Sequence, residues 1–150
     1  MSRYYIPALG NLYASLDRYM LPMLRIVLGA ILIPHGFQKL LGWFGGPGFA
    51  RIAASFDNIG YKPGAFWVTV VCLTEIIGGV MLIFGFFTRF AALGITIFMI
   101  NAVWFTQSTK GFFWLAGGSE YSILILAVAL VFLVKGGGEC SIDAKMSKEL

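Results

Sequence analysis

The sequence predicts an all-α integral membrane protein, a single domain (residues 1–150) built as a bundle of four transmembrane helices. Two observations predict this. Hydrophobic residues make up 59% of the chain and charged residues only 12%, whereas soluble globular domains carry ~25% charged residues. Apolar runs recur at lengths that suit a bilayer, which a helix crosses in ~20 residues. We place the spans at approximately residues 21–42, 66–87, 90–105 and 118–134.

The segment before the first span predicts an amphipathic helix. Within residues 1–20, Leu9, Leu12 and Leu16 recur at helical spacing with polar residues between them. Beside a membrane span, such a helix is expected to lie in the headgroup plane as an N-terminal interfacial helix. No short apolar run with a small-residue cleavage site precedes the first span. We therefore expect the first span to remain as an uncleaved anchor.

The first span carries Arg25, His35 and Lys39 at depths where polar groups are costly. At ~100° per residue, these three side chains share one face of the helix. A polar face inside a membrane should point at other helices or at water. By default it is a candidate functional site.

The connection between the first two spans predicts a short surface helix in the first outer loop. Gly and Pro lie at both of its ends. Between them, Phe49, Ile52, Ala53 and Phe56 form an apolar face opposite Arg51, Ser55 and Asp57. We expect this amphipathic helix to cap the bundle.

The second span contains one charged residue, Glu75, close to its middle. An isolated carboxylate there is unfavourable, so a cationic partner is expected. His35 is the nearest cation in depth, Lys39 can reach from above, and Arg25 can reach from below. The face of the second span that carries Glu75 also carries Cys72, Gly79 and Leu82, and glycines 78 and 79 allow another helix to approach closely.

The second half of the chain predicts two more spans. The third follows a turn at Thr88 and Arg89 and has Asn101 as its main polar residue. The fourth apolar run, residues 121–134, gives only ~21 Å of helix against a ~30 Å bilayer core. We therefore expect this helix to begin before Glu120, or the preceding loop to enter the bundle. The tail after residue 134 is expected to be short and irregular.

The Lys and Arg residues predict that both termini are cytoplasmic. Seven lie on the side with the termini and four on the other, and positive residues favour the cytoplasmic side. The four tryptophans independently fall at the outer interface, where a ring with one N–H group is favoured. They are Trp43, Trp67, Trp104 and Trp114.

The polar residues suggest a ligand site that opens outward. His35, Lys39 and Glu75 are the candidate catalytic residues, as proton donors or relays, and they also head the candidate ligand-binding set, which Glu120, Gln107 and Asn101 complete. The alternative is that these groups form a structural network that fixes helix register. Arg25 and Arg89 are assigned structural roles, because both can extend to the cytoplasmic headgroups.

Other kinds of site find little support in the sequence. A single histidine without a carboxylate cluster does not predict a metal site, and no haem or flavin motif is visible. The two cysteines, Cys72 and Cys140, are too widely spaced for a C-x-x-C motif. The net charge of +4 is dispersed at helix ends, which fits membrane orientation and not nucleic-acid binding.

Several motifs resemble the DoxX family of small four-helix membrane proteins. They are LRIVLGAILIPHGFQKLLGWFGGPG, TEIIGGVMLIFGFFTR, GFF followed by GGSEY, and GGGECSID. The resemblance covers approximately residues 24–144 and implies a prokaryotic inner (cytoplasmic) membrane protein. By that resemblance, the recurrent polar positions fall on Arg25, His35, Lys39, Glu75, Arg89 and Glu120. Family members often carry a second histidine where this chain has Gln107, and glutamine cannot exchange a proton near neutral pH.

Three functions follow from these observations. The first is a membrane subunit of a redox assembly that binds a quinone or another lipid-soluble ligand and receives electrons from a protein partner. The family implies this, because relatives include membrane subunits of thiosulfate:quinone oxidoreductase. The second is a non-catalytic anchor or assembly subunit with a structural polar core. The third is a small-molecule carrier. The lipid bilayer is the expected environment of the chain. Both a monomer and a homo-oligomer are compatible with the sequence.

Overall fold

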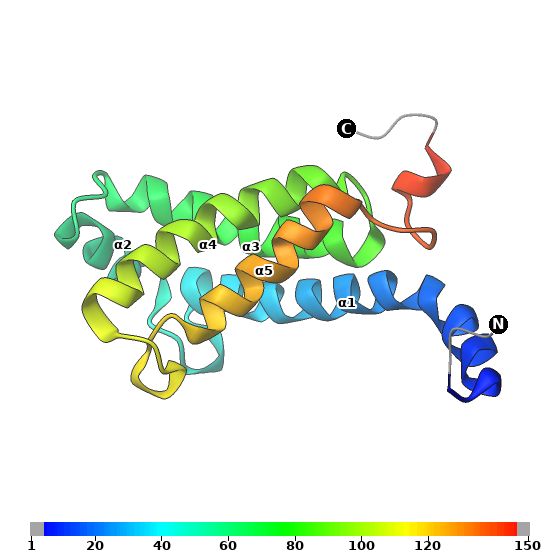
Figure 1. Ribbon diagram of the computed structural model, residues 1–150. Coiled ribbons are helices and arrows are strands. Elements are labelled where there is room, and N and C mark those ends of the chain that lie inside the picture. The colour runs from blue at the N-terminus through cyan, green and yellow to red at the C-terminus, as the bar shows by residue number, and fades with distance from the viewer. Residues whose placement is uncertain (1–4, 147–150) are drawn as a thin grey trace.

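The computed structural model of the protein describes residues 5–146, except for the side chains of residues 7, 8 and 106–108. These residues form an all-α fold, as predicted (Figure 1). The five α-helices are α1 (Pro7–Leu41), α2 (Gly48–Asn58), α3 (Gly64–Phe84), α4 (Thr88–Lys110) and α5 (Glu120–Lys135). Three short 3-10 turns are η1 (Trp43–Gly45), η2 (Trp114–Ala116) and η3 (Asp143–Lys145).

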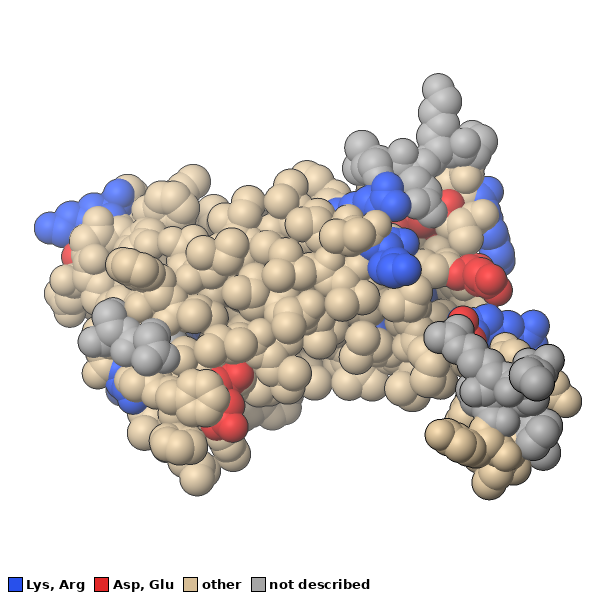
Figure 2. Space-filling model, in the orientation of Figure 1, with Lys and Arg blue, Asp and Glu red and all other residues tan. Residues whose placement is uncertain are grey.

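Three stretches of helix are long and apolar enough to cross a membrane, namely Leu9–Leu41, Gly64–Phe84 and Thr88–Phe105. On the face shown in Figure 2, the visible Lys, Arg, Asp and Glu side chains gather at the two ends of the molecule. An apolar middle between charged ends suits a bilayer. The chain is a multi-pass membrane protein.

The segments that carry the four tryptophans lie together at one end of the molecule. The end of α1 with η1, the start of α3, the end of α4 and η2 meet there (Figure 1). All four tryptophans are exposed, as expected of rings at a membrane interface.

The N-terminal region differs from the prediction, because α1 is one continuous helix and not an interfacial helix followed by a separate span. Its N-terminal part, dark blue in Figure 1, turns away from the axis of the rest. Pro22 lies inside α1, and proline removes one helical hydrogen bond and permits such a bend. The helix ends at Gly42, which adopts a left-handed conformation with φ 72°.

The short helix in the first connection is confirmed as α2. Its apolar residues Phe49, Ile52 and Phe56 are half-buried, whereas Arg51 and Ser55 are exposed. Asp57 has a further role, because its Oδ1 accepts a hydrogen bond of 2.8 Å from the backbone N–H of Gly64 at the start of α3. It caps the N-terminus of the next helix.

Two boundaries in the second half need correction. The second span ends at Phe84 and not at residue 87, because Gly85 (φ 66°) terminates α3. The fourth helix begins at Glu120 and not earlier, since residues 111–119 turn back through η2. Trp114 and Leu115 in this loop are exposed, so the loop does not enter the bundle at these residues.

Helix α1 packs most extensively against α3, and glycines make this contact close. A Cβ added to Gly79 would lie 2.9 Å from the Gly29 carbonyl oxygen and 2.8 Å from Ile33 Cγ1. A Cβ on Gly29 would overlap the Gly79 carbonyl. The predicted close approach at Gly79 is therefore confirmed.

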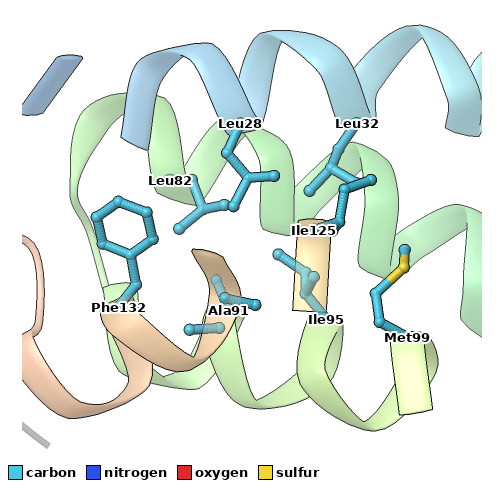
Figure 3. Close-up of a cluster of buried hydrophobic side chains, with 10 residues drawn as sticks. Leu28, Leu32, Leu82, Ala91, Ile95, Met99, Ile125 and Phe132 are labelled. Carbon is cyan, nitrogen blue, oxygen red and sulfur yellow. The ribbon is translucent and has the colours of Figure 1, made fainter. Parts of the chain in front are cut away.

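The apolar core draws on α1, α3, α4 and α5. Figure 3 shows Leu28 and Leu32 projecting from α1 towards the cluster, with Leu82 of α3 beside Leu28 and with Ile95 of α4 and Phe132 of α5 on the side away from α1. All five are buried. This core fixes the positions of α1, α3, α4 and α5 relative to one another, and these helices carry the candidate site.

Candidate functional site

An ion pair between Lys39 and Glu75 lies within the helical bundle. The Lys39 Nζ donates to Oε1 of Glu75 at 2.5 Å and to Oε2 at 2.7 Å. The Glu75 side chain is only 3% exposed, and the Lys39 side chain is 23% exposed. The pair is the one ion pair among the described residues. It supplies the cationic partner that a carboxylate at this depth requires.

The packing of α1 against α3 creates this geometry. A Cβ added to Gly36 would lie 2.5 Å from Ile76 Cγ1 and 3.2 Å from Glu75 Cβ. Gly36 therefore lets α3 approach α1 at the level of Glu75. From there, the flexible stem of Lys39, one turn further along α1, brings its ammonium group to both carboxylate oxygens.

The aromatic ring of Phe98 lies near the ion pair, and His35 lies one helical turn from Lys39. The Lys39 Nζ lies 5.8 Å from the ring centroid of Phe98 on α4, within the ~6 Å at which a ring face attracts a cation. The His35 ring, one turn before Lys39, lies 6.0 Å from the Tyr121 ring of α5. His35 is half-buried. The ion pair thus joins α1, α3 and α4, and His35 connects α1 with α5 one turn away.

Of the three other predicted site residues, two form hydrogen bonds away from the ion pair, and the side chain of the third is not among the described residues. Glu120 accepts a hydrogen bond of 3.2 Å from the Trp114 backbone N–H in the η2 loop. Asn101 is exposed and accepts a hydrogen bond of 2.9 Å from the Tyr61 hydroxyl. The Gln107 side chain lies outside the described residues. The ion pair of Glu75 is with Lys39, and Lys39 does not pair with Glu120 among the described residues.

Arg25 lies in a separate polar centre at the opposite end of α3. Arg25 is only 1% exposed, so its side chain does not extend to the headgroup surface as predicted. Its Nη2 donates to the Cys140 backbone carbonyl at 3.0 Å. A Cβ on Gly85 would overlap Arg25 Nη1, so the guanidinium group occupies the space above Gly85. Arg89 is half-buried in the first turn of α4.

Residues 136–146, which we call the C-terminal clasp, hold this second centre together. The Asp143 backbone N–H donates to the Gly85 carbonyl at 2.8 Å. Its carboxylate accepts from the backbone N–H groups of Phe87 (2.7 Å) and Thr88 (2.8 Å) at the start of α4. Phe87 has φ 47°, which is costly for a residue with a side chain. The Asp143 carboxylate holds this turn in place.

The clasp differs from the prediction of a short and irregular tail. A signal was present in the motif GGGECSID, in which glycines precede a Ser and an Asp that can cap a helix. Gly136 and Gly138 have φ 73° and 76°, and a Cβ on Gly137 would lie 2.7 Å from the Thr88 hydroxyl oxygen. These glycines allow the chain to turn back onto α4.

The described residues contain no group of three or more His, Cys, Asp or Glu side chains that could hold a metal ion. Cys72 is buried and Cys140 is exposed. The chemistry available at the ion pair is therefore that of an ammonium group, a carboxylate and an imidazole. The ammonium and imidazole groups donate hydrogen bonds, the carboxylate accepts them, and all three are groups that can exchange protons.

Comparison with known proteins identifies relatives over most of the chain. A protein of Haemophilus influenzae described as uncharacterized is 33% identical over 134 residues, which cover 87% of this chain and 93% of the relative. An uncharacterized membrane protein of Mycobacterium tuberculosis is 26% identical over 83% of this chain and 80% of its own. A Bacillus subtilis protein named "Putative oxidoreductase CatD" is 29% identical over 81% of this chain and 82% of its own.

No solved structure matches the chain. The family comparison gives a definite result. The sequence profile of the DoxX family matches residues 20–108, which is more than half of the 150 residues and includes Arg25, His35, Lys39 and Glu75. The resemblance seen in the sequence motifs is thus confirmed, and the chain belongs to the DoxX family.

Proposed function

We propose that this DoxX protein is the membrane subunit of a redox assembly and binds a quinone at the Lys39–Glu75 ion pair. The observation that carries the proposal is an ammonium group paired inside the bundle while its side chain stays 23% exposed. Two N–H groups of Lys39 are used by Glu75, and an ammonium group has three. One donor is left for a ligand carbonyl. The relative named as an oxidoreductase supports the reaction class.

The residues around the ion pair suit a quinone head group. A quinone carbonyl needs hydrogen-bond donors and an apolar surround, and Lys39 and His35 are donors while Phe98 and Tyr121 supply apolar ring faces. When bound, a quinone supplies electron-accepting chemistry that consumes protons. The His35 imidazole is a side chain that can carry a proton to or from a bound ligand. Glu75 holds the Lys39 ammonium in place, and the electrons come from a protein partner.

The proposal includes a membrane topology of four spans with both termini in the cytoplasm and the protein in the inner membrane. Helix α5 has 16 residues, or ~24 Å at ~1.5 Å per residue. It runs beside the other long helices and shares their core (Figure 1). The distribution of Lys and Arg supports the orientation. A reporter enzyme that works only in the cytoplasm should be active when it is fused after residue 150.

Ligand binding tests the function. The protein in lipid nanodiscs is titrated with decylubiquinone, and quenching of tryptophan fluorescence is followed. We expect saturable quenching in the native protein and a loss of affinity of about tenfold or more in Lys39→Gln, which corresponds to ~1.4 kcal/mol for one charged hydrogen bond. Lys135→Gln, which removes an exposed lysine in the last turn of α5, is the matched charge control and should bind as the native protein does.

The same titration separates the proposal from its rivals. Quenching that only follows partition into the lipid, equal in native protein and Lys39→Gln, would reject quinone binding at this ion pair. For a non-catalytic anchor, the folded fraction of Lys39→Gln would instead lose a co-purifying partner, while its quinone titration would match that of the native protein. Size-exclusion chromatography and circular dichroism of each variant distinguish a folded protein without affinity from a misfolded one.

A further inference from the structure

A groove of about 340 Å³ runs between α3 and α4, on the bilayer-facing surface of two membrane-spanning helices. Its walls are apolar except for Thr74, and they include the exposed side chains of Leu73, Ile77 and Ile97. The volume lies within the ~300–1,000 Å³ typical of ligand pockets. Glu75 packs towards α1 at Gly36, so this groove is not the site of the ion pair.

The groove exists because two glycines leave space that the protein itself does not use. A Cβ on Gly78 would have no neighbour closer than 3.7 Å, and a Cβ on Gly94 none closer than 3.5 Å. Both are ordinary contact distances. By contrast, Gly79 beside them packs against α1 so closely that a Cβ would lie 2.8 Å from Ile33. Helix packing therefore explains Gly79 but not Gly78 or Gly94.

Polar groups close one end of the groove. Asn101 lies one helical turn beyond Ile97 on α4, and it accepts a hydrogen bond from Tyr61 of the α2–α3 connection. The Tyr61 ring packs edge-on against Trp67 at 5.6 Å. Lys62, the next residue, is exposed. An exposed amide, a phenol, an indole and an ammonium group together form the kind of surface that meets lipid headgroups.

Charge and length favour one kind of occupant. The exposed Lys62 and the exposed Arg51 of α2 carry two positive charges against the one negative charge of Asp57, so the net charge of this connection is positive and suits a phosphate. From Gly64 to Leu73, the first groove residue on α3, is ~14 Å at ~1.5 Å per residue. This is less than half of the ~30 Å bilayer core, which is the depth that one acyl chain spans, so an acyl chain anchored at Lys62 reaches the groove.

We propose that the α3–α4 groove holds one acyl chain of an anionic phospholipid whose phosphate lies at Lys62 beside the Tyr61–Asn101 hydrogen bond. The lipid is a retained component of the fold and not an exchanging solvent molecule. The lipid site is separate from the proposed quinone site, so either proposal can fail while the other holds.

Native mass spectrometry of the full chain released from detergent tests the proposal. We expect the native protein to retain one phospholipid. At Gly94 a Cβ meets only the Thr74 side chain, at 3.5 Å, so Gly94→Leu directs its side chain into the groove and should lower the lipid-bound fraction about fivefold or more. Lys62→Gln should lower it less and remove the preference for anionic over neutral phospholipid added back to delipidated protein. Val131→Leu adds bulk on an exposed face of α5, and as the control it should retain lipid as the native protein does.

Several outcomes would overturn the proposal. These are no retained phospholipid in the native protein, an unchanged bound fraction in Gly94→Leu, or a retained isoprenoid quinone that Gly94→Leu removes. A native dimer that Gly94→Leu converts to a monomer would assign the groove to a second copy of the chain instead. Because Gly94→Leu replaces glycine inside a helix, it should fold at least as well as the native protein, and circular dichroism checks this.

Discussion

Arg25 and Lys39 are both cations on α1, yet the protein surrounds them in different ways. They are 14 positions apart, which is ~21 Å along the helix. Arg25 is 1% exposed and donates to a backbone carbonyl of the C-terminal clasp. Lys39 binds both carboxylate oxygens of Glu75 and keeps its side chain 23% exposed. One cation is sealed by folded chain, and the other is paired by an opposite charge.

This difference separates a structural cation from a candidate functional one. A sealed guanidinium group cannot meet a ligand, whereas an ammonium group with a spare donor and a partly open side chain can. The depth of a charge in the membrane therefore does not by itself identify a site. What identifies it is whether the partner leaves a donor within reach.

The largest expected effect comes from Gly85, where a Cβ would overlap the Arg25 guanidinium group. Gly85→Ala should lower the free energy of unfolding by about 4 kcal/mol, or prevent folding, because it combines a clash with a left-handed φ of 66°. Gly45→Ala is the matched control, since Gly45 has φ 73° but open space around its Cα. Thermal unfolding in detergent measures both. Equal losses would show that only the backbone conformation matters at Gly85.

The next effect concerns the ion pair itself. Lys39→Met leaves the nearly buried Glu75 carboxylate without a partner and should lower the free energy of unfolding by about 3 kcal/mol. The double variant Lys39→Met with Glu75→Met should recover most of this loss, because an apolar pair needs no neutralisation. Unfolding of both variants and of Glu75→Met completes a double-mutant cycle. A cycle with no coupling would mean that the two groups do not interact in the membrane.

The sequence predicted the Lys39–Glu75 end of the molecule better than the Arg25 end, for a physical reason. Helical periodicity places residues on faces, so the buried face with Cys72, Glu75, Gly79 and Leu82 could be derived from spacing alone, and all four are buried. The need to neutralise Glu75 then pointed to α1. Periodicity could not choose between His35 and Lys39, because that choice depends on side-chain reach and on the approach allowed by Gly36.

The clasp was not predictable from periodicity, because it has none. Its contacts join backbone groups of Gly85, Phe87 and Thr88 to residues more than 50 positions later. Composition describes residues 136–146 only as glycine-rich and polar. The continuity of α1 through residues 7–41 was likewise missed, because proline and an amphipathic segment usually mark a boundary.

Smaller effects are expected from the two aspartates that cap helices at opposite ends of the bundle. Asp143→Ala removes both acceptors at the start of α4 and should lower the free energy of unfolding by about 2 kcal/mol. Asp57→Ala removes one acceptor at the start of α3 and should lower it by about 1 kcal/mol. Thermal unfolding of the two variants gives the ranking. The reverse ranking would show that the clasp contributes less than the α2–α3 connection.

The smallest expected effect is at Cys140, and it tests how Arg25 is held. The contact of Arg25 is with the Cys140 backbone carbonyl, while the thiol belongs to an exposed residue. Cys140→Ala should therefore change the free energy of unfolding by less than about 0.5 kcal/mol, as surface substitutions usually do. Arg25→Met should lower the free energy of unfolding much more, because the Cys140 carbonyl then loses the hydrogen-bond donor that the buried Arg25 side chain supplies. A loss in Cys140→Ala as large as that in Asp143→Ala would mean that the side chain, and not the main chain, secures the clasp over Arg25.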